Sequence, residues 1–475
     1  MKKVSLFMTL ALVLFLAACV TPPEPTPDPI PSYDQETFSE VFDHLLDNHY
    51  KQLDEDALWE GAIQGVIDSL DDPYTRYLDA AEFAAFQDSL GESYTGIGVL
   101  VENIDDTVVI RQVFENSPAE RAGILPGDTV THVDGEDFRE KTYFDTVSVI
   151  TGPEGTDVEI GGQRSGLADT LYLTMTRARI DNPSVVVDTF EQNGQTIGYI
   201  EVSSFGAQTF FLFNSYLATL EVESDIDALV IDLRNNGGGY LSTVNNMLNM
   251  FLTSDGLPMF QIEQFENGER TLEEYYADNM NQKEYPIVTL VNEFSASASE
   301  VFAAGMIEAG GYDVLGMPTF GKGTMQVPES LSSTNGDELQ ASVGRWLTPE
   351  GNWINADGGD FTSVNPTILV EQNPFFDQFS IYLAPGETLE FDQVSLKIEN
   401  AQGILSALGY DLRTDGYFDA HTETIVETYQ AANNLPVTGI IDADTAASLS
   451  ADLFTYKQNP VNDVQLQAAI DHLSE

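Results

Sequence analysis

Three apolar segments, each followed by a polar turn, most constrain the fold of this chain. DALVIDL (227–233) runs into RNNGGG, YPIVTLV (285–291) into NEFSASAS, and YDVLGM (312–317) into PTFGKG. Apolar runs of this length are typical of strands buried on both faces of a sheet. Helical patterns alternate with them, which favours an α/β body whose polar loops gather at one edge of the sheet. The sequence therefore predicts a functional site where the three turns meet.

The third turn holds a lysine between two glycines. The chain has eight lysines, and between residues 180 and 391 only Lys283 and Lys322 occur. Glycine on both sides of Lys322 indicates a bent or closely approached backbone, which would hold the ammonium in place. Two chemistries use such a lysine: phosphate binding by a loop, and proton transfer by a general base.

A phosphate-binding loop is the weaker alternative. Residues 316–322 fit most of the pattern G-x-x-x-x-G-K-[ST], but Gly323 stands where a hydroxyl would bind magnesium. Pro328 in the following TMQVPESL disfavours the helix that such a loop requires.

The histidines exclude other chemistries from the α/β body. None of the five lies between residues 180 and 391, so a Ser-His-Asp triad or a histidine metal site cannot form within it. The only cysteine is far from this body, and we expect no metal and no cofactor.

A serine and a lysine can together perform acyl transfer, provided that the amine is neutral. Burial lowers a lysine pKa, and we expect Met317, Phe320 and Met325 to supply apolar surroundings for Lys322. Gln326 is placed to fix the direction of the amine. Among the serines of FSASASE at 295, 297 and 299, helix geometry alone does not select the nucleophile.

The N-terminus has the pattern of a targeting segment. Two lysines precede an apolar run at residues 4–18, which is short for a membrane span and suits a signal peptide. The run ends in LAAC and resembles a bacterial lipobox, which implies lipidation of Cys19 and attachment to a membrane. An ordinary signal peptide is the alternative. A Pro-rich linker follows the signal segment of residues 1–19 and extends over residues 20–34.

Five further segments follow the linker. We expect an N-terminal helical segment at residues 35–93, a β-rich unit at 94–179 and the α/β body at 180–391. A small helical unit at 393–453 and a helical tail at 454–475 complete the chain.

The formal charge of the chain is −58, from 19 basic and 77 acidic residues. Such a charge repels phosphate backbones, so we expect no nucleic acid partner. Most of these carboxylates are expected on a solvated surface.

The β-rich unit resembles a PDZ domain, through GIG after an aromatic residue, the short SPAERAGI helix and the GD and DG turns. Domains of this kind bind a free C-terminal carboxylate with backbone N–H groups of a glycine-containing loop. The resemblance places that loop at Thr95, Gly96, Ile97 and Gly98. A small β-domain without a ligand is the alternative.

Residues 37–391 resemble the carboxyl-terminal processing proteases, which are tail-specific serine peptidases. The ordered motifs DDPYTRYL, DLRNNGGG, FSASASE and TFGKGTMQ carry the resemblance, with the PDZ unit between the first two. It implies a crotonase-like or Clp-like β-β-α core and a PDZ unit that can gate the active site.

The same resemblance implies roles for individual residues. Ser297 would be the nucleophile, Lys322 its base and Gln326 the residue that orients the base. The backbone N–H groups of Gly238 and Ala298 would bind the oxyanion. The family commonly has proline where this chain has Gly237, which weakens the prediction for Gly238.

The segment at 393–453 resembles a peptidoglycan-binding domain through its LGY, DGYFDAHT, YQ and TGIIDADT landmarks. Its alternative interpretation is a helical bundle whose apolar residues are only core.

Together these features predict a lipid-anchored serine endopeptidase of the bacterial cell envelope that acts on protein substrates with free C-termini. The alternative is an inactive scaffold that binds peptides and cell wall. A homo-oligomer or an activating partner is compatible with the sequence, which names neither.

Overall fold

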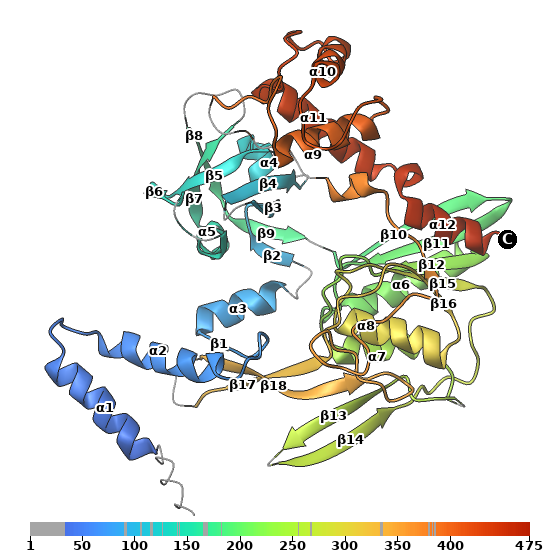
Figure 1. The fold of residues 1–475 in the computed structure, drawn as a ribbon. Coiled ribbons are helices and arrows are strands. Elements are labelled where there is room, and N and C mark those ends of the chain that lie inside the picture. The colour runs from blue at the N-terminus through green and yellow to red at the C-terminus, as the bar shows by residue number, and fades with distance from the viewer. Residues whose placement is uncertain are drawn as a thin grey trace, which may run out of the picture. The chain divides into compact units, whose positions relative to one another are not determined.

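The computed structural model describes residues 34–475, apart from gaps at 90–92, 105–106, 115–116, 126, 140, 142, 165–169, 182, 255, 267, 333–335, 379–380, 382 and 384–385. The predicted signal segment and Cys19 lie outside the described residues. The chain divides after Asp71 into two units, and each is described by itself (Figure 1).

The described part of the first unit consists of two helices, α1 (Gln35–Asn48) and α2 (Glu55–Asp68). Asp34 and Asp54 cap them by accepting hydrogen bonds from backbone N–H groups of the first turn. The rings of Phe42 and Trp59 lie 4.2 Å apart between centroids and join the two helices. Helices thus form here, as the sequence predicts.

The β-rich segment is closed by its own ends. Strand β2 (Ser93–Gly96) pairs antiparallel with β9 (Ala178–Asp181), so the first and last strands of the segment lie side by side. Between them, a second sheet has the order β3-β4-β5-β7-β8, with β6 beside β5. The strands of this sheet are β3 (Val99–Ile104), β4 (Thr107–Val113), β5 (Thr129–Val133), β6 (Glu136–Asp137), β7 (Asp157–Gln163) and β8 (Leu171–Thr176). Helices α4 (Pro118–Ala122) and α5 (Tyr143–Ile150) complete the unit.

The α/β body is built on a sheet of order β10-β11-β12-β15-β16-β19. Its strands are β10 (Val185–Gln192), β11 (Gln195–Val202), β12 (Ala228–Asp232), β15 (Ile287–Val291), β16 (Asp313–Gly316) and β19 (Ile368–Leu369). All neighbours after β11 are parallel, and the three apolar segments of the sequence are the adjacent strands β12, β15 and β16. The prediction that their polar turns reach one edge is therefore confirmed.

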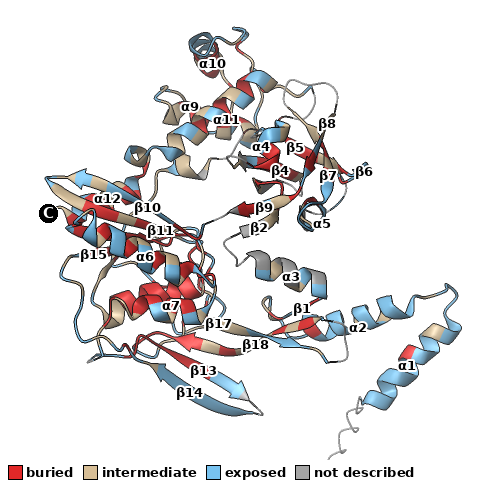
Figure 2. Ribbon diagram, turned by 180° about the vertical axis from the view of Figure 1, so that it is seen from behind, coloured by how far each residue is buried: buried red, intermediate tan, exposed pale blue. Residues whose placement is uncertain are grey.

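Both faces of this sheet are covered. Alternate side chains of β12 point to opposite faces: Leu229 and Ile231 pack in one core cluster, and Ala228 and Val230 in another. Helices α6 (Thr209–Val222), α7 (Leu241–Leu248) and α8 (Ala298–Ala304) contribute to the first cluster. The C-terminal helix α12 (Val464–Leu473) covers the second face (Figures 1 and 2).

A second sheet of the body has the order β1-β18-β13-β14, with β17 also beside β18. Its strands are β1 (Arg76–Leu78), β13 (Phe260–Glu266), β14 (Glu269–Tyr275), β17 (Thr324–Ser330) and β18 (Glu338–Leu347). Strand β1 lies inside the segment expected to be helical, just before α3 (Ala80–Ser89). Three residues are too few for a strand period to appear in the sequence. The segment after Lys322 is the strand β17, not the helix that a phosphate-binding loop requires.

The C-terminal unit contains α9 (Leu396–Ala407), α10 (Ala420–Ala432) and α11 (Ala443–Gln458) around a buried core. Helix α11 continues beyond the boundary expected at residue 453, because its buried face extends to Leu453 and no helix-breaking residue follows before Pro460. Short turns at η1 (Gly305–Ala309), η2 (Pro374–Asp377) and η3 (Pro460–Asn462) complete the list of elements.

Candidate active site

The turns after β12 and β15 are joined by hydrogen bonds. The Ser295 hydroxyl donates to the Leu233 carbonyl at 2.8 Å, and the Ser299 hydroxyl donates to the Asn236 carbonyl at 2.8 Å. The Ala296 N–H donates to the same Asn236 carbonyl at 3.0 Å. These bonds hold the two turns in one fixed arrangement.

The same bonds distinguish the three serines. Ser295 and Ser299 are fully buried, and both hydroxyls are engaged by backbone carbonyls. Ser297 is only partly buried and has φ 55° and ψ −112°, a conformation that a serine rarely adopts. Backbone strain of this kind is characteristic of functional sites. Among these three serines, Ser297 alone is partly exposed and has a strained backbone.

Ala298 begins helix α8, where the first backbone N–H groups have no partner within the helix. An N–H in this place, together with the helix dipole, can stabilise a developing oxyanion. The sequence-predicted donor Ala298 thus stands directly after Ser297 at a helix start.

Gly238, the second predicted oxyanion donor, lies against Ser297, but its N–H already donates a hydrogen bond within its own turn. It adopts φ +109°, and a Cβ on it would lie 3.0 Å from the Ser297 Cβ and 2.9 Å from the Ala296 carbonyl oxygen. Its N–H donates to the Asn236 side-chain oxygen at 2.9 Å. Glycine is required here by the close approach, while the N–H is engaged within its own turn.

The amine of Lys322 lies 4.7 Å from the centroid of the Tyr74 ring. Burial lowers the pKa of Lys322, and the nearby positive charge of Arg76 lowers it further. Among the ion pairs of the described residues, none includes Lys322. Phe320 was expected to cover the amine, but its side chain is 49% exposed. The aromatic cover comes instead from Tyr74.

Tyr74 is held in place by its neighbours in DDPYTRYL. Asp72 accepts hydrogen bonds from the Tyr74 N–H at 3.0 Å and from the Thr75 hydroxyl at 2.6 Å. The Ser342 N–H of strand β18 donates to that hydroxyl at 3.0 Å. The segment that carries Tyr74 is therefore fixed to the second sheet.

Gln326 lies on strand β17, which begins two residues after Lys322. It stands at a bulge in the pairing of β17 with β18. Its amide nitrogen donates to Thr324 at 2.9 Å and to Ser342 at 3.0 Å. Among the hydrogen bonds of the described residues, none joins Gln326 to Lys322. The Gln326 amide is therefore fixed by Thr324 and Ser342 and not by the Lys322 amine.

Glu300 joins the segments of Ser297 and Lys322. Its carboxylate accepts bonds from the N–H groups of Ser297 at 2.8 Å, Gly321 at 2.7 Å and Lys322 at 2.8 Å, and from the Thr319 hydroxyl at 2.6 Å. Burial raises its pKa, while these bonds act in the opposite direction.

The backbone nitrogens of Ser297 and Lys322 both donate to the same oxygen of Glu300, each at 2.8 Å. These two backbone nitrogens are therefore at most twice 2.8 Å apart. Glu300 thus brings the backbones of the predicted nucleophile and base together, although none of the hydrogen bonds among the described residues links their side chains.

Sequence reasoning gave no role to Tyr74 or Glu300, although both stand within the quoted motifs. Their contacts join segments that are distant in the sequence, so a local pattern does not reveal them. The signal that the sequence offered was that Tyr74 stands in DDPYTRYL and Glu300 in FSASASE.

Of the predicted peptide-binding loop, Thr95 and Gly96 are the last residues of strand β2 and pair with β9, and only Ile97 and Gly98 connect β2 to β3. Ile97 is buried, and its carbonyl accepts the Ala119 N–H at 2.8 Å. Gly98 has φ +83°, and a Cβ on it would lie 2.2 Å from the Ser117 Cβ. The loop therefore packs against the start of α4 and requires its glycine.

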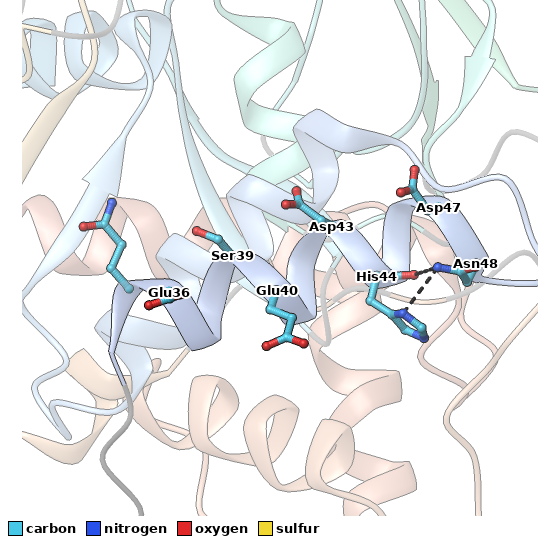
Figure 3. A pocket seen from close by; sticks show the side chains of 8 residues that line it. Glu36, Ser39, Glu40, Asp43, His44, Asp47 and Asn48 are labelled. Atoms are coloured by element: carbon cyan, nitrogen blue, oxygen red, sulfur yellow. Dashed lines mark hydrogen bonds between the residues drawn. The ribbon is translucent and has the colours of Figure 1, made fainter.

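A hollow lined by helix α1 contains no residue of the candidate active site or of the predicted peptide-binding loop (Figure 3). Acidic side chains such as Glu40 and Asp43 line it, and Asn48 bonds to His44. All of its lining comes from one helix, and it contains none of the predicted catalytic residues. Across the described ranges, no helix meets the length and apolarity of a membrane span, and no three candidate metal ligands are grouped.

Four family models match successive parts of the chain. The model of peptidase family S41 covers residues 196–370, and a PDZ domain model covers 95–174. The model of the activating protease CtpB N-terminal domain covers 29–82, and a peptidoglycan binding domain model covers 395–449.

The relatives agree with these models. The chain is 36% identical to the carboxy-terminal processing protease CtpB of Bacillus subtilis, over 90% of this chain and 87% of that protein. It is 31% identical to CtpA of the same organism, over 92% of this chain and 90% of that protein. A solved structure of a photosystem II D1 C-terminal processing protease is 26% identical with a TM-score of 0.46, covering 70% of this chain and 92% of that chain. The chain belongs to the carboxy-terminal processing proteases, serine-type endopeptidases of peptidase family S41 with a PDZ domain.

Proposed function

We propose that Ser297 is the nucleophile of this protease and Lys322 its general base, in an acyl-enzyme mechanism. The observation that carries the proposal is the arrangement of the three serines. Two hydroxyls are committed to backbone carbonyls, while Ser297 stands in a strained conformation at the start of α8. Glu300 fixes the backbone of this serine beside that of Lys322.

The chemistry begins with a neutral lysine, because only a neutral amine can accept a proton. Lys322 takes the proton of the Ser297 hydroxyl as the oxygen attacks a peptide carbonyl. The carbonyl π electrons move to oxygen and give a tetrahedral oxyanion. Its collapse breaks the C–N bond, and the Lys322 ammonium protonates the leaving amine. Water then attacks the ester carbonyl and gives a proton to Lys322. Collapse of this second oxyanion breaks the bond between the acyl carbon and Ser297 Oγ, which takes the proton back from Lys322, and releases the new C-terminal acid.

The oxyanion needs hydrogen-bond donors at the position where its charge develops. The Ala298 N–H supplies one at the start of α8. The Gly238 N–H can supply a second only when it exchanges the Asn236 side chain for the substrate oxygen. The resting arrangement of residues 236–238 therefore requires a small rearrangement before catalysis. Gln326 would orient the Lys322 amine during proton transfer, from its fixed place on β17.

The remaining units give the protease its substrates and its location. The loop at Thr95, Gly96, Ile97 and Gly98 would bind the free C-terminal carboxylate of a protein substrate. The C-terminal unit would bind peptidoglycan, and lipidation at Cys19 would attach the chain to a membrane. The domain limits predicted from sequence form part of this proposal. An inactive scaffold with the same binding units is the competing function.

The test uses the chain without residues 1–19 and an unstructured protein with a free apolar C-terminus, analysed by mass spectrometry. We expect cleavage by the unaltered chain and a loss of at least about 10³-fold in the variant Ser297→Ala, because removal of a nucleophile eliminates the covalent route. The variants Ser295→Ala and Ser299→Ala are matched controls that keep Ser297. Equal cleavage by Ser297→Ala would refute the assignment, and no cleavage by any form would favour the scaffold.

A further inference from the structure

The C-terminal helix α12 is a structural part of the catalytic body. Four of its apolar side chains, at Leu466, Ala469, Ile470 and Leu473, pack against the second face of the sheet. The chain reaches this helix only after passing through the peptidoglycan-binding unit. That unit is therefore inserted between β19 and the helix that completes the sheet.

Asp463, which precedes α12, forms an ion pair with the buried side chain of Arg234. One guanidinium nitrogen of Arg234 lies 2.5 Å from an oxygen of Asp232 and 2.7 Å from an oxygen of Asp463. A second nitrogen donates to the other Asp463 oxygen at 2.8 Å. The side chains of Arg234 and Asp463 are each 11% exposed. A bidentate pair of this kind fixes the orientation of the guanidinium.

Arg234 is the first residue of the turn that reaches the predicted active site. Its own N–H donates to Asp232 at 2.9 Å, and the next residue, Asn235, exchanges hydrogen bonds with the Asn292 side chain. Asn236 then accepts bonds from the Ala296 N–H and the Ser299 hydroxyl. These contacts thus join the turn that begins at Arg234 to Ala296 and Ser299, which flank Ser297 in the sequence.

The two chain segments that connect the inserted unit are also tied together. Gln372 donates to Asp463 at 2.8 Å, and Asn373 donates to the Tyr456 hydroxyl at 3.0 Å. The Lys457 amine donates to the Gln378 carbonyl at 2.7 Å. Asp463 therefore stands where the outgoing segment, the returning segment and Arg234 meet.

We infer that Asp463 is a positioning residue that acts through Arg234 to hold residues 235–238 beside the Ser297 segment, where the Gly238 N–H can exchange Asn236 for the substrate oxygen. The inference rests on the proposed function of that turn. It assigns the segment after the peptidoglycan-binding unit a part in catalysis, in addition to its part in the fold.

A charge-removing substitution isolates this role. Asp463 also caps α12 by accepting the Leu466 N–H at 3.0 Å, and asparagine is an equally good cap. Asp463→Asn therefore keeps the helix start and the side-chain shape, but it weakens the pair with Arg234. Asp471→Asn is the matched control on the same helix, because Asp471 is exposed and bonds to Gln192 at 2.9 Å.

The experiment measures kcat, KM and thermal stability for the full processed chain, with assays far below the melting temperature of each variant. We expect Asp463→Asn to lower kcat about tenfold with KM within about twofold, because loss of a whole oxyanion donor costs about 10²- to 10³-fold. Asp471→Asn should leave kcat unchanged. Asp463→Glu should restore part of the loss, since it returns the charge.

The double variant with Arg234→Met tests the route. If Asp463 acts through Arg234, adding Asp463→Asn to Arg234→Met should lower kcat no further. A reduced melting temperature with unchanged kcat in Asp463→Asn would overturn the inference and leave a purely structural pair. The proposed function fails differently: Ser297→Ala would then cleave as well as the unaltered chain.

Discussion

The two lysines of the α/β body occupy opposite environments. Lys283 lies 2.6 Å from a carboxylate oxygen of Glu221 on α6, and the Tyr285 hydroxyl donates to the same oxygen. Lys322 lies against the face of the Tyr74 ring instead. The carboxylate of Glu300 is close to the Lys322 loop, but it accepts its hydrogen bonds from backbone N–H groups and from the Thr319 hydroxyl.

This difference shows how one residue type serves two purposes in the same domain. An ion pair favours the charged amine, whereas burial without a paired carboxylate favours the neutral one. Glu300 stabilises the Lys322 loop through the backbone amides of that loop, without forming an ion pair with the Lys322 amine. The electrostatic attraction of Glu300 and Asp72 raises the pKa of Lys322, but burial is the larger effect and the net pKa is lowered.

The largest expected effect comes from removing each amine in turn. Lys322→Met should lower kcat by about 10³-fold or more, within the range in which general base catalysis contributes. Lys283→Met should leave kcat within about twofold and lower the free energy of unfolding by about 1 kcal/mol or less, because it removes only a partly exposed ion pair. Peptide cleavage assays and urea unfolding measure the two quantities. Equal losses of kcat in both variants would show that the two environments do not differ in function.

The next effect tests the carboxylate that joins the two catalytic segments. Glu300→Gln keeps the size of the side chain but replaces a charged acceptor of four hydrogen bonds with a neutral amide. We expect kcat/KM to fall about 10- to 100-fold, because small displacements of reacting groups are costly. The control is Glu263→Gln, which alters a buried carboxylate paired with Arg270 and Arg345.

The control should mainly lower thermal stability, since it removes the negative charge that two arginines share and one of its two acceptor oxygens. A kcat/KM of Glu300→Gln equal to that of the unaltered chain, with both variants folded, would refute the positioning role of Glu300.

The smallest effect concerns the aromatic cover of the base. Tyr74→Ala should admit water to the Lys322 amine and raise its pKa, because the loss of burial outweighs the cation–π attraction of about 0.5–1 kcal/mol. The general base works as the neutral amine, so activity rises with pH through this pKa. The rise of kcat/KM with pH should therefore move to higher pH, with a loss of up to about tenfold near neutrality.

Tyr74→Leu is the matched variant, because it keeps the apolar cover and removes only the attraction of the ring for a cation. Its profile should move to lower pH. Shifts of both variants in the same direction would contradict the balance of burial and cation–π attraction described above.

The sequence predicted more of the central sheet of the α/β body than of the short elements around it. Long buried strands such as residues 227–233 show their class directly, because both faces are apolar and the turn residues that follow are polar. Strand β1 was missed, because three residues give no period and their partner in β18 is more than 250 positions away.

The sequence by itself determined the chemistry available to this protein: a body without histidine, a glycine-flanked lysine, three serines and the order of the motifs. Only the tertiary structure distinguished the three serines, because it engages the Ser295 and Ser299 hydroxyls with carbonyls at the end of another strand and leaves Ser297 partly exposed. It also decided that Tyr74 covers Lys322 and that Asp463 meets Arg234. Such contacts join segments far apart in the chain, so local sequence patterns do not encode them, and packing alone brings them together.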